Sequence, residues 1–262
     1  MTAPGTLLAQ MRQTAPLVQN ITNFVAMNIM ANVMLAAGAS PAMVHGHEEA
    51  AEFAGLADAL SVNIGTASGD WVDAMEGAAR AARGHGKPWV LDPVAAGATG
   101  FRRQLCARLM QQSPTILRGN ASEILAVAGE AASGRGADTS DPVAAAEDAA
   151  LRIAREHGMV VAVTGPVDYV TDGRRIARVA NGDAMMPRVT ALGCSLTGLV
   201  AAFAVGQDPF DATVAALVCF GVAGEVAAET ARGPGSFQVA FLDALHALQP
   251  DQLAARARVR AS

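Results

Sequence analysis

Residues 188–198 read Arg-Val-Thr-Ala-Leu-Gly-Cys-Ser-Leu-Thr-Gly. The β-branched pair Val189 and Thr190 leads into small residues, Gly193 permits a tight turn, and an apolar run to Val205 follows. This pattern predicts a strand or loop that feeds the N-terminus of a buried helix. The first N–H groups of a helix lack intrahelical partners and carry the positive end of its dipole, so they can bind a phosphate or a developing oxyanion.

Cys194 lies at the predicted start of this helix. The field of a helix N-terminus lowers the pKa of a thiol placed there, so Cys194 is the cysteine with a candidate chemical role. The alternative is that Cys194 is a small apolar residue that fills space under the helix cap. The sequence leaves both interpretations open.

Upstream of this stretch, predicted helices alternate with short apolar strands. The helices show apolar residues three and four positions apart, and the strands end in polar or glycine-rich turns. Strands are expected at residues 17–23, 41–44, 60–64, 89–92, 115–117 and 159–163, and helices at 7–11, 24–37, 48–57, 70–83, 99–111, 121–128 and 142–157. Such alternation predicts an α/β fold with a mostly parallel sheet and right-handed crossovers.

A hairpin is predicted next, because the β-rich runs 167–171 and 174–179 flank the turn pair Asp172-Gly173. This adds antiparallel strands at one side of the sheet. From Cys194 onward the chain is expected to be helical, at about 194–206, 211–231 and 236–247. Neither repeats nor a linker interrupt the sequence, so one domain over residues 1–262 is expected.

The composition favours an oligomer. Hydrophobic residues make up 52% of the chain and aromatic residues only 4%, so Ala, Val, Leu, Ile and Met must build the core. Charged residues, at 16%, fall below the usual ~25%, which indicates surface buried against another subunit. The net charge is −5, and no basic cluster precedes the tail with Arg256, Arg258 and Arg260. Nucleic acid is therefore not an expected partner, and the tail is expected to be solvated.

The cysteines and the apolar runs favour a cytoplasmic protein. The three cysteines, Cys106, Cys194 and Cys219, are scattered and lack CxxC spacing, so neither disulfides nor a structural zinc site is expected. The N-terminus shows no basic-then-apolar signal. The longest apolar run, about residues 212–224, is shorter than the ~20 residues of a membrane span.

Polar and glycine-rich residues follow the predicted strands. Ligands bind at the carboxyl ends of parallel strands, so these residues predict a binding site. Arg118 can bind phosphate oxygens with its guanidinium fork, and the Thr164 hydroxyl can bond to a phosphate or a base. Asp92 and Glu123 are candidate Mg²⁺ partners, directly or through water, because magnesium prefers oxygen ligands.

Simpler interpretations of these residues remain open. Asp92 before Pro93 fits a turn that ends a strand, and Asn120 with Glu123 fits a capping box. Met43 fits a core position. Neither a Walker A sequence nor a GxGxxG loop is found, so any ATP site belongs to another type.

One further stretch stands apart in composition. Residues 129–141, rich in Gly, Ser and Asp, are a candidate mobile flap or a plain surface loop.

Seven segments between about Leu17 and Leu248 are informative together. They are Asn20-Ile21-Thr22-Asn23, Gly38-Ala39-Ser40-Pro41-Ala42-Met43, Asn63-Ile64-Gly65-Thr66, Leu91-Asp92-Pro93-Val94-Ala95-Ala96-Gly97-Ala98-Thr99, Leu117-Arg118-Gly119-Asn120-Ala121-Ser122-Glu123-Ile124, Val167-Asp168-Tyr169-Val170 and Leu192-Gly193-Cys194. In their order and spacing the chain resembles the hydroxyethylthiazole kinases, a family of the ribokinase-like superfamily. Seven segments in register make the resemblance far more specific than any one of them.

The resemblance implies a three-layer ribokinase-like fold and ATP- and Mg²⁺-dependent phosphorylation of the hydroxyl of 4-methyl-5-(2-hydroxyethyl)thiazole, a step of thiamine salvage. It also implies a homotrimer with sites at subunit interfaces. The matching positions are Met43, Ala191 and Asn23 for the thiazole pocket, Arg118 and Thr164 for ATP, Asp92 and Glu123 for the acidic pair near Mg²⁺, and Gly193 with Cys194 for the anion hole and the position of the catalytic base.

One departure leaves the substrate open. The family pattern Thr-Gly-Thr-Gly-Cys becomes Thr190-Ala191-Leu192-Gly193-Cys194 here, so Ala191 adds a methyl group and Leu192 replaces a hydroxyl. Three alternative functions are considered beside the thiazole kinase. They are a kinase for a pyrimidine or pyridoxal-like alcohol, a hydrolase with Cys194 as nucleophile, and a non-catalytic oligomeric binding protein. The hydrolase lacks an obvious histidine partner near the strand ends.

Overall fold

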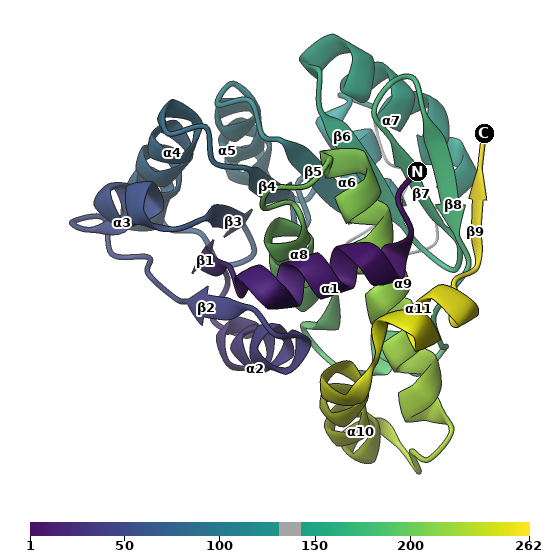
Figure 1. The fold of residues 1–262 in the computed structure, drawn as a ribbon. Helices are drawn as coiled ribbons and strands as arrows, with labels where there is room; N and C mark the ends of the chain where they lie inside the picture. The colour runs from purple at the N-terminus through teal and green to yellow at the C-terminus, as the bar shows by residue number, and fades with distance from the viewer. Residues whose placement is uncertain (131–142) are drawn as a thin grey trace.

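The computed structural model describes residues 1–130 and 143–262, and within these ranges nine strands form one mixed sheet (Figure 1). In spatial order the strands are β2 (Ser40–Ala42), β1 (Leu17–Ile21), β3 (Ala59–Asn63), β4 (Trp89–Asp92), β5 (Ile116–Asn120), β6 (Val160–Thr164), β7 (Asp168–Thr171), β8 (Ile176–Val179) and β9 (Val259–Ala261). Neighbouring strands are parallel from β2 to β6 and antiparallel from β6 to β9.

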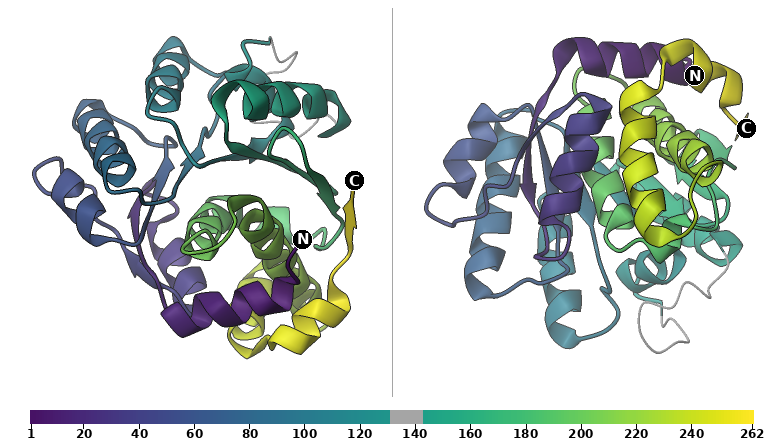
Figure 2. Two further views of the ribbon diagram at one scale, coloured as in Figure 1. Left: turned by 45° about the horizontal axis from the view of Figure 1, so that its top comes forward. Right: turned by 90° about the horizontal axis from the view of Figure 1, so that it is seen from below.

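Helices cover both faces of the sheet (Figure 2). One face carries α3 (Ala50–Leu56), α4 (Gly69–Gly84), α5 (Gly100–Met110), α6 (Ala121–Val127) and α7 (Val143–His157). The other face carries α1 (Pro4–Thr14), α2 (Met27–Ala37), α8 (Leu192–Phe203), α9 (Pro209–Ala228), α10 (Pro234–Ala247) and α11 (Pro250–Arg256), with the short 3₁₀ turn η1 (Met186–Arg188) before α8. The predicted three-layer α/β architecture is confirmed.

The sheet face under α8 changes from apolar to polar along each central strand. Side chains of a strand alternate between its two faces. On β4, Val90 lies in the apolar cluster beneath α8, whereas Asp92, two residues further on, hydrogen-bonds to α8. On β5, Ile116 lies in the same cluster and Arg118 hydrogen-bonds to the start of α8. The first halves of these strands therefore build the core, and their carboxyl ends build a polar layer.

The C-terminal tail is part of the sheet. The sequence predicted a solvated end after three C-terminal helices, and Arg256, Arg258 and Arg260 are indeed exposed. The prediction missed the secondary structure there: α11 packs against α1, and β9 pairs with β8. Arg258 also forms an ion pair with Glu225 and donates to the carbonyl of Ala180. An unpaired edge strand leaves a row of N–H and C=O groups open, and β9 satisfies this row on β8.

Two further expectations concern α9 and the segment 129–141. Helix α9, with 20 residues and a mean hydropathy of 1.6, is long and apolar enough to cross a membrane, although the predicted apolar run was shorter. Because 89% of an 18-residue stretch of this helix is buried inside the fold, packing accounts for its apolar composition. The candidate flap at residues 129–141 lies almost entirely outside the described residues.

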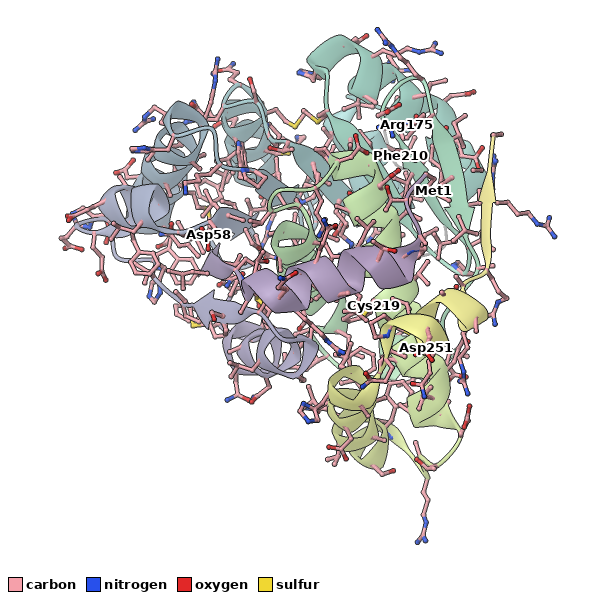
Figure 3. The ribbon with its side chains drawn as sticks, in the orientation of Figure 1. Met1, Asp58, Arg175, Phe210, Cys219 and Asp251 are labelled. Carbon is pink, nitrogen blue, oxygen red and sulfur yellow. The ribbon has the colours of Figure 1, made fainter. Side chains whose placement is uncertain are left out.

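The predicted hairpin is confirmed as β7 and β8, and Arg175 ties its turn to the start of α9. Gly173 supplies the left-handed residue of this turn, with φ of 89°. The Arg175 guanidinium lies 4.4 Å from the ring centre of Phe210, and Figure 3 labels both residues. It also pairs with Asp172 at 2.6 Å and with Asp208 at 3.0 Å. The contact joins the antiparallel strands to the helical layer.

Replacing Arg175 by Met is expected to lower the free energy of unfolding by about 1–2 kcal/mol, because a half-exposed cation–π contact and three ion pairs, with Asp172, Asp208 and Asp211, are lost. Thermal unfolding measures the change. Arg174→Met is the control, since the side chain of Arg174 is exposed and makes no ion pair within residues 1–130 and 143–262. Equal melting temperatures for the two variants would contradict this role of Arg175.

Candidate active site

Helix α8 (Leu192–Phe203) starts two residues before the predicted position and packs on β3 and β4 in the middle of the sheet (Figure 1). The residue before it, Ala191, is left-handed, with φ of 63°, and its carbonyl accepts the Ser195 N–H at 2.9 Å. Gly193 in the first turn is exposed. The free N–H groups of this turn are therefore available to an anion.

Leu192 does not belong to the exposed part of this turn. Its side chain is 3% exposed and lies in the apolar cluster beneath α8. The departure from a hydroxyl residue at this position therefore adds packing to the core.

The thiol of Cys194 accepts a hydrogen bond from a side-chain amide, and the helix N-terminus does not make it a thiolate. The Asn23 side chain donates to the sulfur at 3.3 Å. Burial, together with the nearby charge of Asp92, raises the pKa of the Cys194 thiol to about 11. The expected lowering by the helix N-terminus was wrong, because loss of water and a neighbouring carboxylate both oppose a thiolate.

A chain of amides links Cys194 to Asp92. Asn23 also donates to Asn63 Oδ1 at 3.0 Å, and Asn63 in turn donates to Asp92 Oδ2 at 2.8 Å. The Thr197 hydroxyl donates to the same oxygen at 2.8 Å. The sequence placed Asn63 at the end of a predicted strand without giving it a role, and it did not single out Thr197. Thr197 could have been found from its spacing, since it lies four residues after Gly193 and therefore on the same helix face.

Arg118 connects the start of α8 with two strand ends. Its Nη1 donates to the carbonyl of Gly193 at 3.0 Å, and its Nη2 donates to the Thr164 hydroxyl at 2.7 Å. Nη1 also lies 3.7 Å from Asp92 Oδ2. The residues proposed for nucleotide and for the anion hole thus meet around one guanidinium.

The two acidic residues differ in how their oxygens are used. In the part of the chain that the structure describes, buried Asp92 Oδ1 has no hydrogen-bond partner. Both oxygens of Glu123 accept backbone N–H groups, from Ala95 at 3.0 Å and from Asn120 at 2.8 Å. Burial raises the pKa of Asp92 against the opposing effect of Arg118. Burial and the charge of Asp92 raise the pKa of Glu123 to about 7.

The capping-box interpretation of Asn120 and Glu123 is confirmed at the start of α6, where each side chain accepts the other residue's N–H. Within residues 1–130 and 143–262, no group of three or more His, Cys, Asp or Glu is arranged to hold a metal ion. A metal site here needs oxygens from a ligand as well.

Met43 follows β2 at the same edge of the sheet. It is partly buried and packs against the apolar cluster that Ala191 also contacts. Its carbonyl lies 3.2 Å from His45 Nδ1, and the His45 ring lies against Trp71, with ring centres 4.8 Å apart. Met43 and Ala191 therefore share one cluster, and His45 belongs to an aromatic contact.

Residues 8–251 match the family model described as "HK: Hydroxyethylthiazole kinase family". The chain belongs to the hydroxyethylthiazole kinase family. It is 67% identical to a hydroxyethylthiazole kinase of Cereibacter sphaeroides, over 98% of each chain. These similarities assign it to the phosphotransferases.

Solved structures agree with this family. A hydroxyethylthiazole kinase protein from Pyrococcus horikoshii OT3 is similar with a TM-score of 0.92 and 42% identity, over 99% of this chain and 98% of that one. A ribokinase-like superfamily protein from Enterococcus faecalis V583 is similar with a TM-score of 0.64 and 12% identity, over 92% and 93% of the two chains. The second likeness concerns the fold alone, which is ribokinase-like.

Ala191→Gly is expected to raise the free energy of unfolding by about 0.5–1 kcal/mol. The left-handed conformation strains alanine in the folded state, and relief of this strain outweighs the extra conformational entropy of glycine in the unfolded state. Ala240→Gly, inside α10, is the matched control and should lower it by about 0.5–1 kcal/mol. Denaturant unfolding of both variants measures the difference. A loss of stability in Ala191→Gly would contradict the strain at this helix start.

Alkylation of Cys194 by iodoacetamide at pH 7 is expected to be at least about 100-fold slower than that of an ordinary thiol, because only the thiolate reacts and a raised pKa keeps it scarce. The rate should keep rising beyond pH 9. Peptide mass spectrometry follows the reaction at Cys194. Asp92→Asn should speed it, since the opposing charge is removed. A rate that levels off below pH 8 would show a lowered pKa instead.

Proposed function

We propose that this chain catalyses ATP-dependent phosphorylation of the hydroxyl of 4-methyl-5-(2-hydroxyethyl)thiazole, a step of thiamine salvage. The observation that carries the proposal is the meeting of Arg118, Thr164 and Gly193 at the start of α8, beside a buried carboxylate. The names of the relatives in the chain's family support the substrate.

The thiazole end of the site is formed by Met43, Ala191 and Asn23. Met43 and Ala191 supply apolar contact from one cluster. Asn23 reaches the sulfur of Cys194 and supplies the polar side of the pocket. The substrate hydroxyl lies at Cys194. The raised pKa of the Cys194 thiol supports a neutral thiol, which positions this hydroxyl by hydrogen bonding.

The phosphate end is formed by Arg118, Thr164 and the first turn of α8. Arg118 and Thr164 bind ATP, and the N–H groups of Gly193 and Cys194 take up charge on the transferring group. Phosphoryl transfer depends on alignment and charge neutralisation more than on a strong base. A neutral Cys194 therefore suffices beside an anion hole.

Mg²⁺ fits this site at Asp92. Magnesium takes oxygen ligands and keeps several waters, and within the described ranges Asp92 Oδ1 is a buried carboxylate oxygen without a partner. Bound with ATP, Mg²⁺ neutralises phosphate charge. Asp92 would hold the ion, and Glu123 would lie near it.

The active protein is a homotrimer with its sites at subunit interfaces. Phe24 and Val25, directly after Asn23, are exposed apolar side chains, which supports a subunit interface beside the site. The low share of charged residues agrees with this. We also place the trimer in the cytoplasm. We take residues 1–262 as one domain, because both apolar clusters pack on the same sheet.

A pyrimidine or pyridoxal-like alcohol is the second candidate substrate. The specific observation in its favour is Ala191, whose methyl group stands where the family pattern has glycine. A changed pocket wall at this position alters which ring fits beside Met43. The kinase chemistry is the same for both substrates.

ADP release with each alcohol tests the proposal. The hydroxyethylthiazole is expected to give the highest kcat/KM, and EDTA should abolish turnover. Arg118→Met should lower kcat/KM by about 100-fold or more, because a charged contact to the transferring phosphate is lost. Higher kcat/KM with pyridoxal or with a hydroxymethylpyrimidine would select the second substrate. ADP release with none of the alcohols would overturn the kinase function.

A further inference from the structure

The loop after Asp92 contains a strained residue. Ala95 has φ of 52°, a left-handed conformation that favours glycine. Its N–H donates to Glu123 Oε1 at 3.0 Å, and its carbonyl accepts the Ala98 N–H at 3.0 Å. Arg102 holds the same loop from α5, by donating to the carbonyl of Val94 at 2.8 Å. Tertiary hydrogen bonds therefore fix a conformation that alanine alone disfavours.

Glu123 supplies the bond to Ala95 from a buried position. It is 7% exposed, and its second oxygen accepts the Asn120 N–H at 2.8 Å. One carboxylate thus joins the end of β5 to the loop after β4. Gly119 makes this closure possible, because a Cβ there would lie 3.1 Å from Glu123 Cβ and 3.3 Å from Pro93 Cγ.

We propose that Glu123 is a positioning residue, which serves the phosphotransfer site by holding Ala95 and the loop behind Asp92 and does not ligate the metal ion itself. The role in catalysis rests on the proposed kinase function, since the loop continues directly from Asp92. The shaping of the loop itself does not depend on the reaction.

Glu123 and Asp92 differ in the hydrogen-bond partners of their carboxylate oxygens. Within residues 1–130 and 143–262, the buried Asp92 Oδ1 is left without a hydrogen-bond partner. Each Glu123 oxygen is already committed to a backbone N–H. Removing Glu123 leaves two N–H groups without their acceptor and leaves Ala95 in a disfavoured conformation. The loop that continues from Asp92 is then no longer fixed at Ala95.

The test is a double-variant cycle of Glu123→Ala and Ala95→Gly. Glu123→Ala is expected to lower kcat/KM at least tenfold and to lower the melting temperature without Mg²⁺ or nucleotide. Ala95→Gly alone should leave the activity unchanged. Added to Glu123→Ala, it should restore kcat/KM several-fold, because glycine adopts the left-handed conformation without support.

A second glycine variant controls for general stabilisation. Ala15, between α1 and β1, is exposed and also left-handed, with φ of 43°. Ala15→Gly in the Glu123→Ala background can raise the melting temperature but should restore no activity. Equal rescue by Ala15→Gly, or no rescue by Ala95→Gly, would overturn the proposed role.

Amide hydrogen exchange of the peptide covering residues 93–99 tests the loop without any substrate. Exchange should be at least tenfold faster in Glu123→Ala than in the wild type, and unchanged protection would overturn the proposal even if the chain has a different activity. Glu123→Gln keeps one acceptor oxygen and should lose less activity than Glu123→Ala. Equal losses in both, with normal protection of the loop, would indicate that the charge binds the metal ion directly.

Discussion

The buried pair of Arg118 and Asp92 is the interaction on which the site depends. Both side chains are less than a tenth exposed, and their closest charged atoms are 3.7 Å apart. Breaking a buried pair of this kind costs about 3–5 kcal/mol, because one charge is then left without compensation. Hydrogen bonds to Gly193 and Thr164 on one side, and from Asn63 and Thr197 on the other, satisfy part of the pair, while in the described ranges the buried atoms Arg118 Nε and Asp92 Oδ1 have no partner.

Burial, more than this pair, decides the state of Cys194. Loss of water and the negative charge of Asp92 both raise the pKa of the thiol, and they outweigh the Asn23 bond and the charge of Arg118, which lower it. A thiol at a helix N-terminus is therefore neutral here. The local motif supplies the position of the sulfur, and its burial beside Asp92 favours the neutral form.

The sequence predicted most of the fold and many of the site residues because both follow from local patterns. Periodicity located β4 and α8, and the polar residues after each strand marked one edge of the sheet. Asn63 and Thr197 were missed as site residues, because an amide in a strand and a threonine in an apolar helix are ordinary residues until their partners are known. The pairing of β9 with β8 was missed because it joins segments about 80 residues apart.

By itself the sequence determined the order of the elements, the polar edge of the sheet and the family, since these depend on spacing along the chain. Only the tertiary structure decided which carboxylate oxygens have hydrogen-bond partners. Asp92 and Glu123 are both acidic residues after a strand, yet Glu123 is committed to two backbone amides and Asp92 Oδ1, in the described ranges, has no partner. The physical reason is that a buried polar atom is costly without a partner, and the available partners come from segments that only folding brings together.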